Sequence, residues 1–249
     1  MYKSIAIYPH NIDESYIRKV VNSVSLAKKY NFNEVFTSVH LPEYTFDTQI
    51  EALKIVSCEA RKQDLTVTVD IGGNYINQVL NDQSYLRILN NAKIDFIRLD
   101  YGFEFEQVQT LYNKLNIKGF VINASIYNQE EVEELIKRLK TIDEYIEIRA
   151  CHNYYIRKET GIDEIFALKQ DDIFKTLNIP VYYCIPTLSN PRGPLHLGLC
   201  TIEKHRNMPI ENILIDLYLN HDLNAFMMAD EWLSEEEFRK VDSTLEHLT

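Results

Sequence analysis

Carboxylate side chains stand at the ends of two neighbouring apolar, strand-like runs in this sequence. Asp70 closes one run, and Asp100 follows the next run with Arg98 two residues before it. Residues two apart on a strand share a face, so Arg98 and Asp100 should point the same way. Two such carboxylates suit glycoside hydrolysis, in which one protonates the leaving oxygen and the other attacks carbon or activates water. The alternatives are a structural ion pair for Arg98 and a turn-capping role for Asp70.

Two further carboxylates are reserve candidates for the same chemistry. Asp230 follows the last strand-like run, and Glu203 lies in a long polar segment close to His205 and Arg206. The alternative for the group 203–206 is a surface ion-pair cluster on a short helix. The catalytic candidates are therefore Asp100, Asp70, Asp230 and Glu203.

Several residues with hydrogen-bonding side chains could bind a sugar or its charged substituents. Arg192 precedes Gly193 and could grip phosphate or carboxylate in a bidentate manner, with close backbone approach at the glycine. The alternative there is a turn with a solvated arginine. His152 could bind a ligand or transfer protons, or it could be a buried structural histidine. The substrate-binding candidates are Tyr8, Arg98, Asn123, His152, Asn153, Arg192 and His205.

Composition and cysteine spacing argue against several other classes of protein. The formal net charge of −11 disfavours a general nucleic-acid binder, which needs a basic face. No HxH or HExxH spacing suggests a catalytic metal, and the four scattered cysteines form no CxxC pair. A nucleophilic Cys151 next to His152 is disfavoured, because adjacent strand residues point to opposite faces.

The sequence predicts a protein that neither crosses a membrane nor enters the secretory route. No run of eighteen uninterrupted apolar residues is present, and the amino terminus has no long apolar segment typical of a signal peptide. Reduced thiols in a cytoplasmic protein are the simplest interpretation of the cysteines.

Short apolar runs rich in β-branched residues alternate with longer helical patterns along the whole chain. This alternation predicts an α/β protein with a parallel sheet, and eight units in 249 residues favour a single-domain (β/α)₈ barrel. No GxGxxG follows the first run, which weakens a dinucleotide-binding interpretation. The expected strands are 4–8, 34–38, 66–70, 96–99, 119–123, 146–150, 181–185 and 225–229, and the expected helices are 13–30, 48–63, 83–91, 104–115, 129–139, 160–177, 209–219 and 234–248.

One segment has two possible interpretations. By composition 212–215 could be a buried strand, but Ile210, Ile213, Leu214 and Leu217 have helical spacing and follow Pro209. We therefore predict a helix there and place the eighth strand at 225–229. In such barrels the active site lies at the carboxyl ends of the strands, where the polar candidates stand.

Taken together, these residues resemble the MupG-like family of bacterial 6-phospho-N-acetylmuramidases. The matching segments follow the family's order over almost the whole chain. They are 7–9, 36–38, 98–103, 123–125, 151–155, 160–161, 192–195 and 201–206, including Arg98-Leu99-Asp100-Tyr101-Gly102-Phe103 and Cys151-His152-Asn153-Tyr154-Tyr155.

The resemblance implies a (β/α)₈ catalytic domain over 1–249 that hydrolyses the β-1,4 bond between N-acetylmuramic acid 6-phosphate and N-acetylglucosamine. It implies a cytoplasmic role in cell-wall recycling, a small-molecule phosphosugar substrate and no cofactor. The family's usual C-terminal, cyclophilin-like domain is not expected within this chain.

The alternative from another class is a non-catalytic phosphosugar-binding module or regulator. A Schiff-base aldolase is disfavoured, because none of the expected strands contains a lysine.

Overall fold

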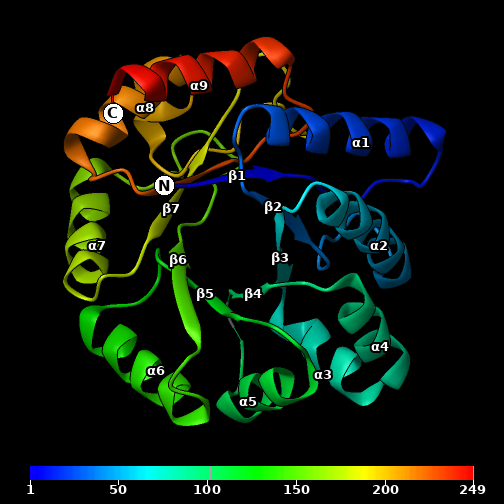
Figure 1. The fold of residues 1–249 in the computed structure, drawn as a ribbon. Helices are drawn as coiled ribbons and strands as arrows, with labels where there is room; N and C mark the ends of the chain where they lie inside the picture. Colours follow the sequence, from blue (N-terminus) through cyan, green and yellow to red (C-terminus); the bar gives the residue numbers. More distant parts are fainter. Residues whose placement is uncertain (101, 249) are drawn as a thin grey trace.

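Eight parallel strands pair in sequence order, and the eighth pairs with the first to close a barrel (Figure 1). The computed structural model describes residues 1–100 and 102–248, so Tyr101 of the matched segment and Thr249 at the end of the expected domain lie outside the described residues. The strands are β1 (Tyr2–Ala6), β2 (Glu34–Ser38), β3 (Thr66–Ile71), β4 (Phe96–Leu99), β5 (Gly119–Asn123), β6 (Glu147–Cys151), β7 (Val181–Ile185) and β8 (Ala225–Met228).

Helices surround the barrel and connect successive strands (Figure 1). They are α1 (Glu14–Lys29), α2 (Phe46–Lys62), α3 (Gly73–Asn81), α4 (Gln83–Ala92), α5 (Phe105–Lys114), α6 (Gln129–Ile142), α7 (Glu164–Thr176), the 3-10 turn η1 (Glu203–His205), α8 (Ile210–Asn220) and α9 (Glu235–Leu248). In the described part of the chain, no helix combines the length and the apolar character needed to cross a membrane. The predicted single-domain (β/α)₈ barrel is confirmed.

Local capping explains where several helices begin. Asp13 accepts a hydrogen bond from the backbone N–H of Tyr16, and Asp163 does the same for Phe166, so α7 starts four residues later than predicted. Asn128 and Glu131 form a reciprocal capping box at the start of α6. The ambiguous segment 212–215 lies within α8, as its helical spacing predicted.

Two further differences from the sequence expectation concern β1 and α3. The first strand runs from Tyr2 to Ala6, two residues earlier than predicted, which preserves the side-chain parity. The helix α3 was not predicted, because its glycine start and its asparagines favour a turn and no side chain caps it. Burial of Ile76 and Val79 against the core overrides that weak local preference.

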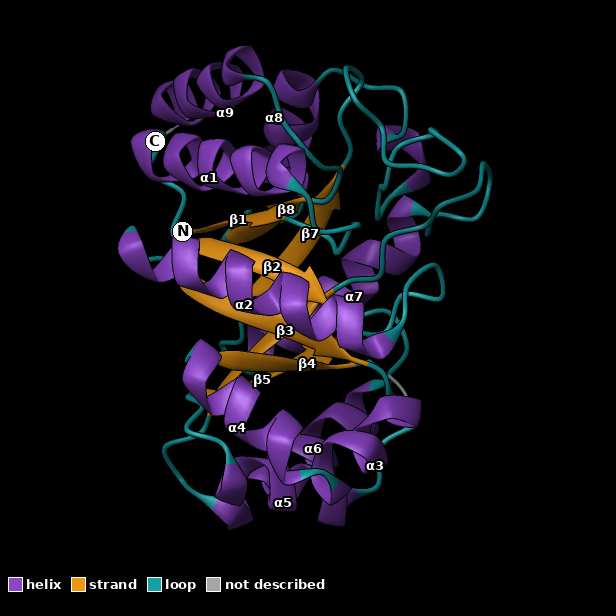
Figure 2. Ribbon diagram, turned by 90° about the vertical axis from the view of Figure 1, so that its right-hand side faces the viewer, coloured by secondary structure: helices purple, strands orange, loops and turns teal. Residues whose placement is uncertain are grey.

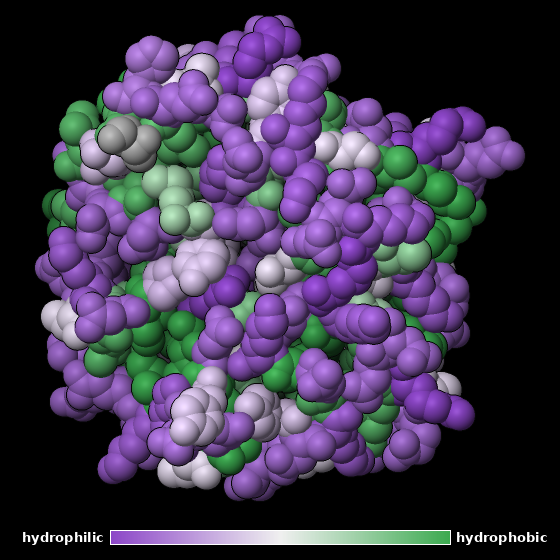
Figure 3. Space-filling model, viewed as in Figure 1, coloured by the Kyte–Doolittle hydropathy of each residue, from purple (hydrophilic) through white to green (hydrophobic). Residues whose placement is uncertain are grey.

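The core has two layers, one between the barrel and its helices and one inside the barrel. Inward-facing residues such as Ala6, Phe36, Phe96, Val121 and Met227 fill the interior, which is therefore packed and not a pore. The loops that follow the carboxyl ends of the strands gather at one end of the barrel (Figure 2). Figure 3 views the opposite end, where hydrophilic side chains cover much of the face.

A buried ion pair lies inside the barrel, toward the amino ends of the strands. The Arg149 Nη1 atom lies 2.7 Å from Oε2 of Glu34 and also donates to the Tyr182 hydroxyl oxygen at 3.1 Å. The guanidinium stands 3.8 Å from the centre of the Phe96 ring. Burial raises the pKa of Glu34, while the charge of Arg149 acts in the opposite direction.

One lysine lies in a strand, contrary to the expectation. Lys3 belongs to β1, but its parity is opposite to that of the inward-facing Ala6, and its Nζ atom donates to the Tyr30 carbonyl oxygen at 3.0 Å. Its side chain therefore lies on the outer side of the sheet and does not enter the barrel interior, where a Schiff-base lysine would be needed.

We predict that Arg149→Met lowers the free energy of unfolding by about 3–5 kcal/mol, because it leaves the Glu34 carboxylate buried without its partner. Chemical denaturation would measure this. The double variant Arg149→Met with Glu34→Leu should recover most of the loss, and Arg18→Met, which removes an exposed pair with Glu14, should change little. A loss for Arg149→Met as small as that for Arg18→Met would contradict the prediction.

Candidate active site

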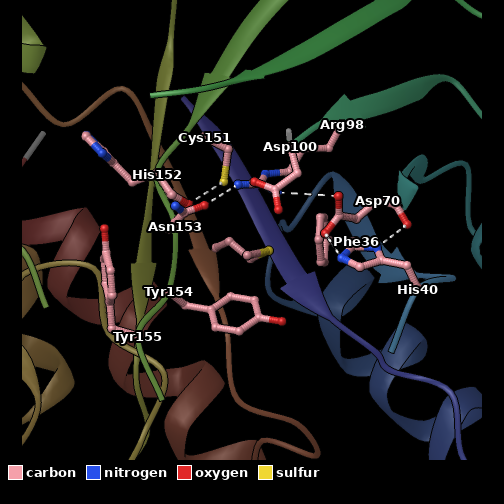
Figure 4. Close-up of a pocket in the computed structure, with 11 residues that line it drawn as sticks. Phe36, His40, Asp70, Arg98, Asp100, Cys151, His152, Asn153, Tyr154 and Tyr155 are labelled. Atoms are coloured by element: carbon pink, nitrogen blue, oxygen red, sulfur yellow. Dashed lines mark hydrogen bonds and ion pairs between the residues drawn. The ribbon is translucent and has the colours of Figure 1, made fainter. Parts of the chain in front are cut away.

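A polar cavity of about 230 Å³ opens at the carboxyl ends of the strands, on the axis of the barrel (Figure 4). Five of the candidate residues line it: Asp70, Arg98, Asp100, His152 and Asn153. The other lining residues are Phe36, His40, Cys151, Tyr154, Tyr155 and Met227. Strands β2, β3, β4 and β6 thus bring together groups that are distant in the sequence.

Arg98 connects the two leading carboxylates. Its Nη1 atom lies 3.4 Å from Oδ1 of Asp70 and 3.2 Å from Oδ1 of Asp100. Asp70 and Arg98 are register partners on β3 and β4, and Arg98 and Asp100 share the inward face, as predicted from their spacing. The Nη2 atom donates to Oδ1 of Asn153 at 2.7 Å. The arginine therefore fixes both carboxylates at one end of the barrel interior.

Amide side chains hold Asp100 from the other side. The Asn123 Nδ2 atom donates to Oδ1 of Asp100 at 2.7 Å and to Oδ1 of Asn153 at 3.0 Å. The Asn123 Oδ1 atom accepts a hydrogen bond from the Ser125 backbone at 2.8 Å, which fixes the amide orientation. Asn123 itself does not line the cavity, so it contacts the site through Asp100 and Asn153.

Burial and charge act in opposite directions on the two charged groups of this centre. Burial raises the pKa of Asp70, although the positive charges of Arg98 and His40 oppose the change. Burial also disfavours the charged form of Arg98, but the nearby carboxylates of Asp70 and Asp100 outweigh it and raise its pKa. The Asp70 carboxyl group therefore keeps its proton to a higher pH than a free aspartate does.

Sequence reasoning did not select His40 as a site residue. Its Nε2 atom lies 3.7 Å from Oδ2 of Asp70, and its Nδ1 atom lies 3.2 Å from the Ser38 hydroxyl. Gly72 permits this position, because a Cβ atom there would stand 3.0 Å from Cγ of His40. The signal was available, since His40 lies two residues beyond the expected strand 34–38.

Arg192 lies at the mouth of the barrel, above Tyr8. Its guanidinium carbon is 4.3 Å from the centre of the Tyr8 ring, and its Nη2 atom is 3.9 Å from Oε1 of Glu43. Its side chain is only 10% exposed, yet its buried Nε–H has no hydrogen-bond partner among the described residues. Tyr8 is fully buried and donates its hydroxyl to the Ala229 carbonyl oxygen, so it supports Arg192 and leaves no free hydroxyl for a ligand.

Three candidates bind other parts of the protein and do not line the cavity. Asp230 accepts hydrogen bonds from the backbone N–H groups of Thr187, Arg192 and Leu199, which fix the loop after β7. Glu203 pairs with Arg206 and accepts from the backbone of Glu159 and Gly161. His205 is buried, and its Nε2 atom lies 2.7 Å from Oδ2 of Asp216 on α8.

His152 borders the cavity, but its ring points away from the carboxylates (Figure 4) and packs against Tyr183 of the outer core layer. Its Nδ1 atom lies 3.0 Å from the Ser125 hydroxyl, and its ring centre is 4.8 Å from that of Tyr183. Cys151 faces the cavity instead, as strand alternation predicted. Burial lowers the pKa of His152 to about 3, so this imidazole stays neutral at physiological pH.

We predict that His152 makes the protein less stable as the pH falls. The unfolded chain binds a proton at His152 below about pH 6.5, whereas the folded chain does not until about pH 3. Stability from this group is therefore complete above pH 6.5 and is lost as the pH falls below it. Relative to His152→Gln, the wild type should lose about 2 kcal/mol of unfolding free energy between pH 7 and pH 5.

Urea denaturation at both pH values measures this difference. His247→Gln on α9, where the ring is exposed, is the control and should follow the wild type. An unchanged gap between wild type and His152→Gln would rule out a neutral, buried His152.

Known proteins share this fold and this sequence pattern. The family model described as 6-phospho-N-acetylmuramidase, N-terminal (MupG), matches residues 4–243. A conserved Enterococcus faecalis protein of unknown function is 26% identical with a TM-score of 0.76, and 96% of this chain and 64% of that chain are aligned. For an uncharacterized B. cereus protein the identity is 24%, the TM-score is 0.75, and the coverage is 97% and 64%.

This chain therefore spans 64% of the length of each of these two structures. A sialic acid synthetase from Leptospira borgpetersenii, with 9% identity and a TM-score of 0.59, shares the fold alone and matches over 98% of this chain and 82% of its own. No curated protein sequence matched this chain. Because the family match extends over nearly the whole barrel, the chain belongs to the MupG N-terminal, 6-phospho-N-acetylmuramidase family.

Proposed function

We propose that this protein is a glycoside hydrolase that separates N-acetylmuramic acid 6-phosphate from β-1,4-linked N-acetylglucosamine during cytoplasmic recycling of the cell wall. The observation that carries the proposal is the pair Asp70 and Asp100, both joined to Arg98 in the cavity at the carboxyl ends of the strands. The family membership supports the substrate class. The proposed chemistry requires two carboxyl groups and water, and no cofactor.

The spacing of the two carboxylates favours a retaining reaction. One oxygen of each lies against the same Nη1 atom of Arg98, at 3.4 and 3.2 Å, so the two oxygens cannot be farther apart than the sum of these distances. Retaining glycosidases hold their carboxyl groups about 5–5.5 Å apart, whereas inverting enzymes leave about 6.5–9.5 Å for a water molecule. This upper limit admits the retaining spacing and reaches only the lower edge of the inverting range, so we propose that one carboxylate acts as the nucleophile.

Environment separates the roles of the two groups. Asp70 is nearly buried and its pKa is raised, mainly by burial, which suits a general acid that donates its proton to the glycosidic oxygen. The side chain of Asp100 is 20% exposed and is held by Arg98 and Asn123. In the proposed reaction Asp100 attacks the anomeric carbon, the N-acetylglucosamine leaves, and Asp70 then removes a proton from the water that releases the sugar.

Arg192 is the proposed anchor for the phosphate group. Its buried Nε–H has no partner among the described residues, and its nearest carboxylate oxygen, on Glu43, is at 3.9 Å. A buried donor without a partner is costly, and a phosphate oxygen would satisfy it with a charge-assisted hydrogen bond. Tyr8 and Tyr154 connect Arg192 to the cavity, since the Tyr8 ring contacts both Arg192 and Tyr154.

We predict that Asp100→Asn lowers hydrolysis of the phosphorylated disaccharide by at least about 10²-fold while binding is retained, because the amide cannot attack carbon. Incubation with the disaccharide and mass spectrometry of the released monosaccharides measures turnover. Asp70→Asn should be equally poor on this substrate, but with an activated aryl leaving group, which needs no acid, it should recover the first step and release a burst of the aryl group. Asp100→Asn should not recover.

Asp222→Asn, at an exposed position, is the matched control and should keep full activity. Full activity of Asp100→Asn would remove Asp100 from the mechanism. If the wild type binds the disaccharide and releases no monosaccharide, the barrel is a binding module and the hydrolase proposal fails.

We predict that Arg192→Gln weakens binding of N-acetylmuramic acid 6-phosphate by about 10- to 100-fold, because it removes a charge-assisted contact. Binding of the unphosphorylated sugar should change little. Isothermal titration calorimetry of both sugars gives the ratio, and Arg157→Gln, at an exposed position in the loop after β6, is the control. An equal loss for both sugars would assign Arg192 a structural role.

A further inference from the structure

A second group of metal-ligating side chains lies outside the barrel interior, between α7 and α8, which are neighbours in Figure 1. Glu164 is the first residue of α7, Asp216 lies in α8, and His221 follows the end of α8. One carboxylate oxygen of each acid and one imidazole nitrogen lie within 4.8 Å of one another. None of the three lines the cavity of the candidate active site.

His221 supplies an independent indication of a ligand. Its side chain is completely buried, and its Nε2 atom has no hydrogen-bond partner among the described residues. Its Nδ1 atom lies 2.7 Å from Oδ2 of Asp171, and the other oxygen of Asp171 accepts a hydrogen bond from Tyr183 at 2.5 Å. A carboxylate that binds Nδ1–H in this way orients an imidazole so that its second nitrogen can coordinate a metal.

A cation already occupies the acidic part of the group. The Lys204 ammonium lies 2.5 Å from Oε1 of Glu164 and 2.9 Å from Asp216. His205 Nε2 and Asn220 Nδ2 also contact the Asp216 carboxylate, at 2.7 and 2.9 Å, and fix its position. Lysine satisfies the carboxylates and leaves the His221 Nε2 atom unpaired. A divalent ion could engage all three ligands if the flexible lysine side chain moved aside.

We propose that Glu164, Asp216 and His221 form a binding site for a divalent transition metal of the zinc class, and that Lys204 competes with the metal for it. One imidazole nitrogen with carboxylate oxygens is a donor set that suits zinc, whereas magnesium and calcium prefer oxygen alone. The site joins α7 to α8. Its role is to hold two outer helices together and not to take part in glycoside hydrolysis.

Isothermal titration of the metal-free full chain with ZnCl₂ tests the proposal, and the visible absorption of the Co²⁺ form reports the coordination. The wild type should bind one equivalent. His221→Gln should bind at least about 10-fold more weakly, since it removes a ligand. Lys204→Met should bind more tightly by about 10-fold, because the competing charge is gone. MgCl₂ should not compete with zinc.

Matched controls separate this site from adventitious binding and from unfolding. His247→Gln and Lys240→Met remove an exposed imidazole and a partly exposed ammonium on α9 and should leave zinc binding unchanged. Glu164→Gln provides a second ligand variant at a helix start if His221→Gln fails to fold by circular dichroism. Absence of zinc binding in Lys204→Met, or equal affinity in the wild type and both ligand variants, would overturn the proposal and leave a lysine-bridged ion cluster.

Discussion

The guanidinium of Arg98 is the charge around which the mouth of this barrel is organised. A positive charge buried on the barrel axis is tolerated only when carboxylates and hydrogen-bond acceptors surround it. Asp70 on β3 supplies these contacts together with Asp100 and Asn153, which lie just beyond the ends of β4 and β6. The same contacts fix the distance between the two carboxylates. The stability of the barrel mouth and the geometry of the proposed chemistry therefore depend on one side chain.

Among the described residues, two separate charged groups lie inside the barrel, one toward each end of the strands. Glu34 and Arg149 form the pair toward the amino ends of the strands, and the group centred on Arg98 lies at the carboxyl ends. Inward-facing apolar residues such as Phe36 and Val121 belong to the packed interior of the same barrel. Neither Glu34 nor Arg149 lines the cavity at the carboxyl ends of the strands. We therefore interpret the Glu34–Arg149 pair as structural and the group centred on Arg98 as functional.

Not every carboxylate at the strand ends is available for chemistry. Asp230 binds three backbone N–H groups and thereby holds the loop that carries Arg192. Glu203 binds two more and pairs with Arg206, whose guanidinium also donates to backbone carbonyl oxygens of the neighbouring loops. These acids compensate for the lack of regular structure in a long loop, where backbone groups have no strand or helix partners. They contribute to the site by fixing the backbone of the loops around it.

The sequence by itself determined the (β/α)₈ architecture and the end of the barrel where polar side chains gather. The two-residue period of the strands was also sufficient to place Arg98 and Asp100 on the inner face and to separate Cys151 from His152. Only the tertiary structure decided which acids face the cavity and which bind backbone amides. It also decided that His152 points toward the helices and that Arg192 rests on Tyr8. The reason is physical: periodicity reports which face of a strand a side chain occupies, whereas its partners depend on how the barrel closes and how its loops fold over the mouth.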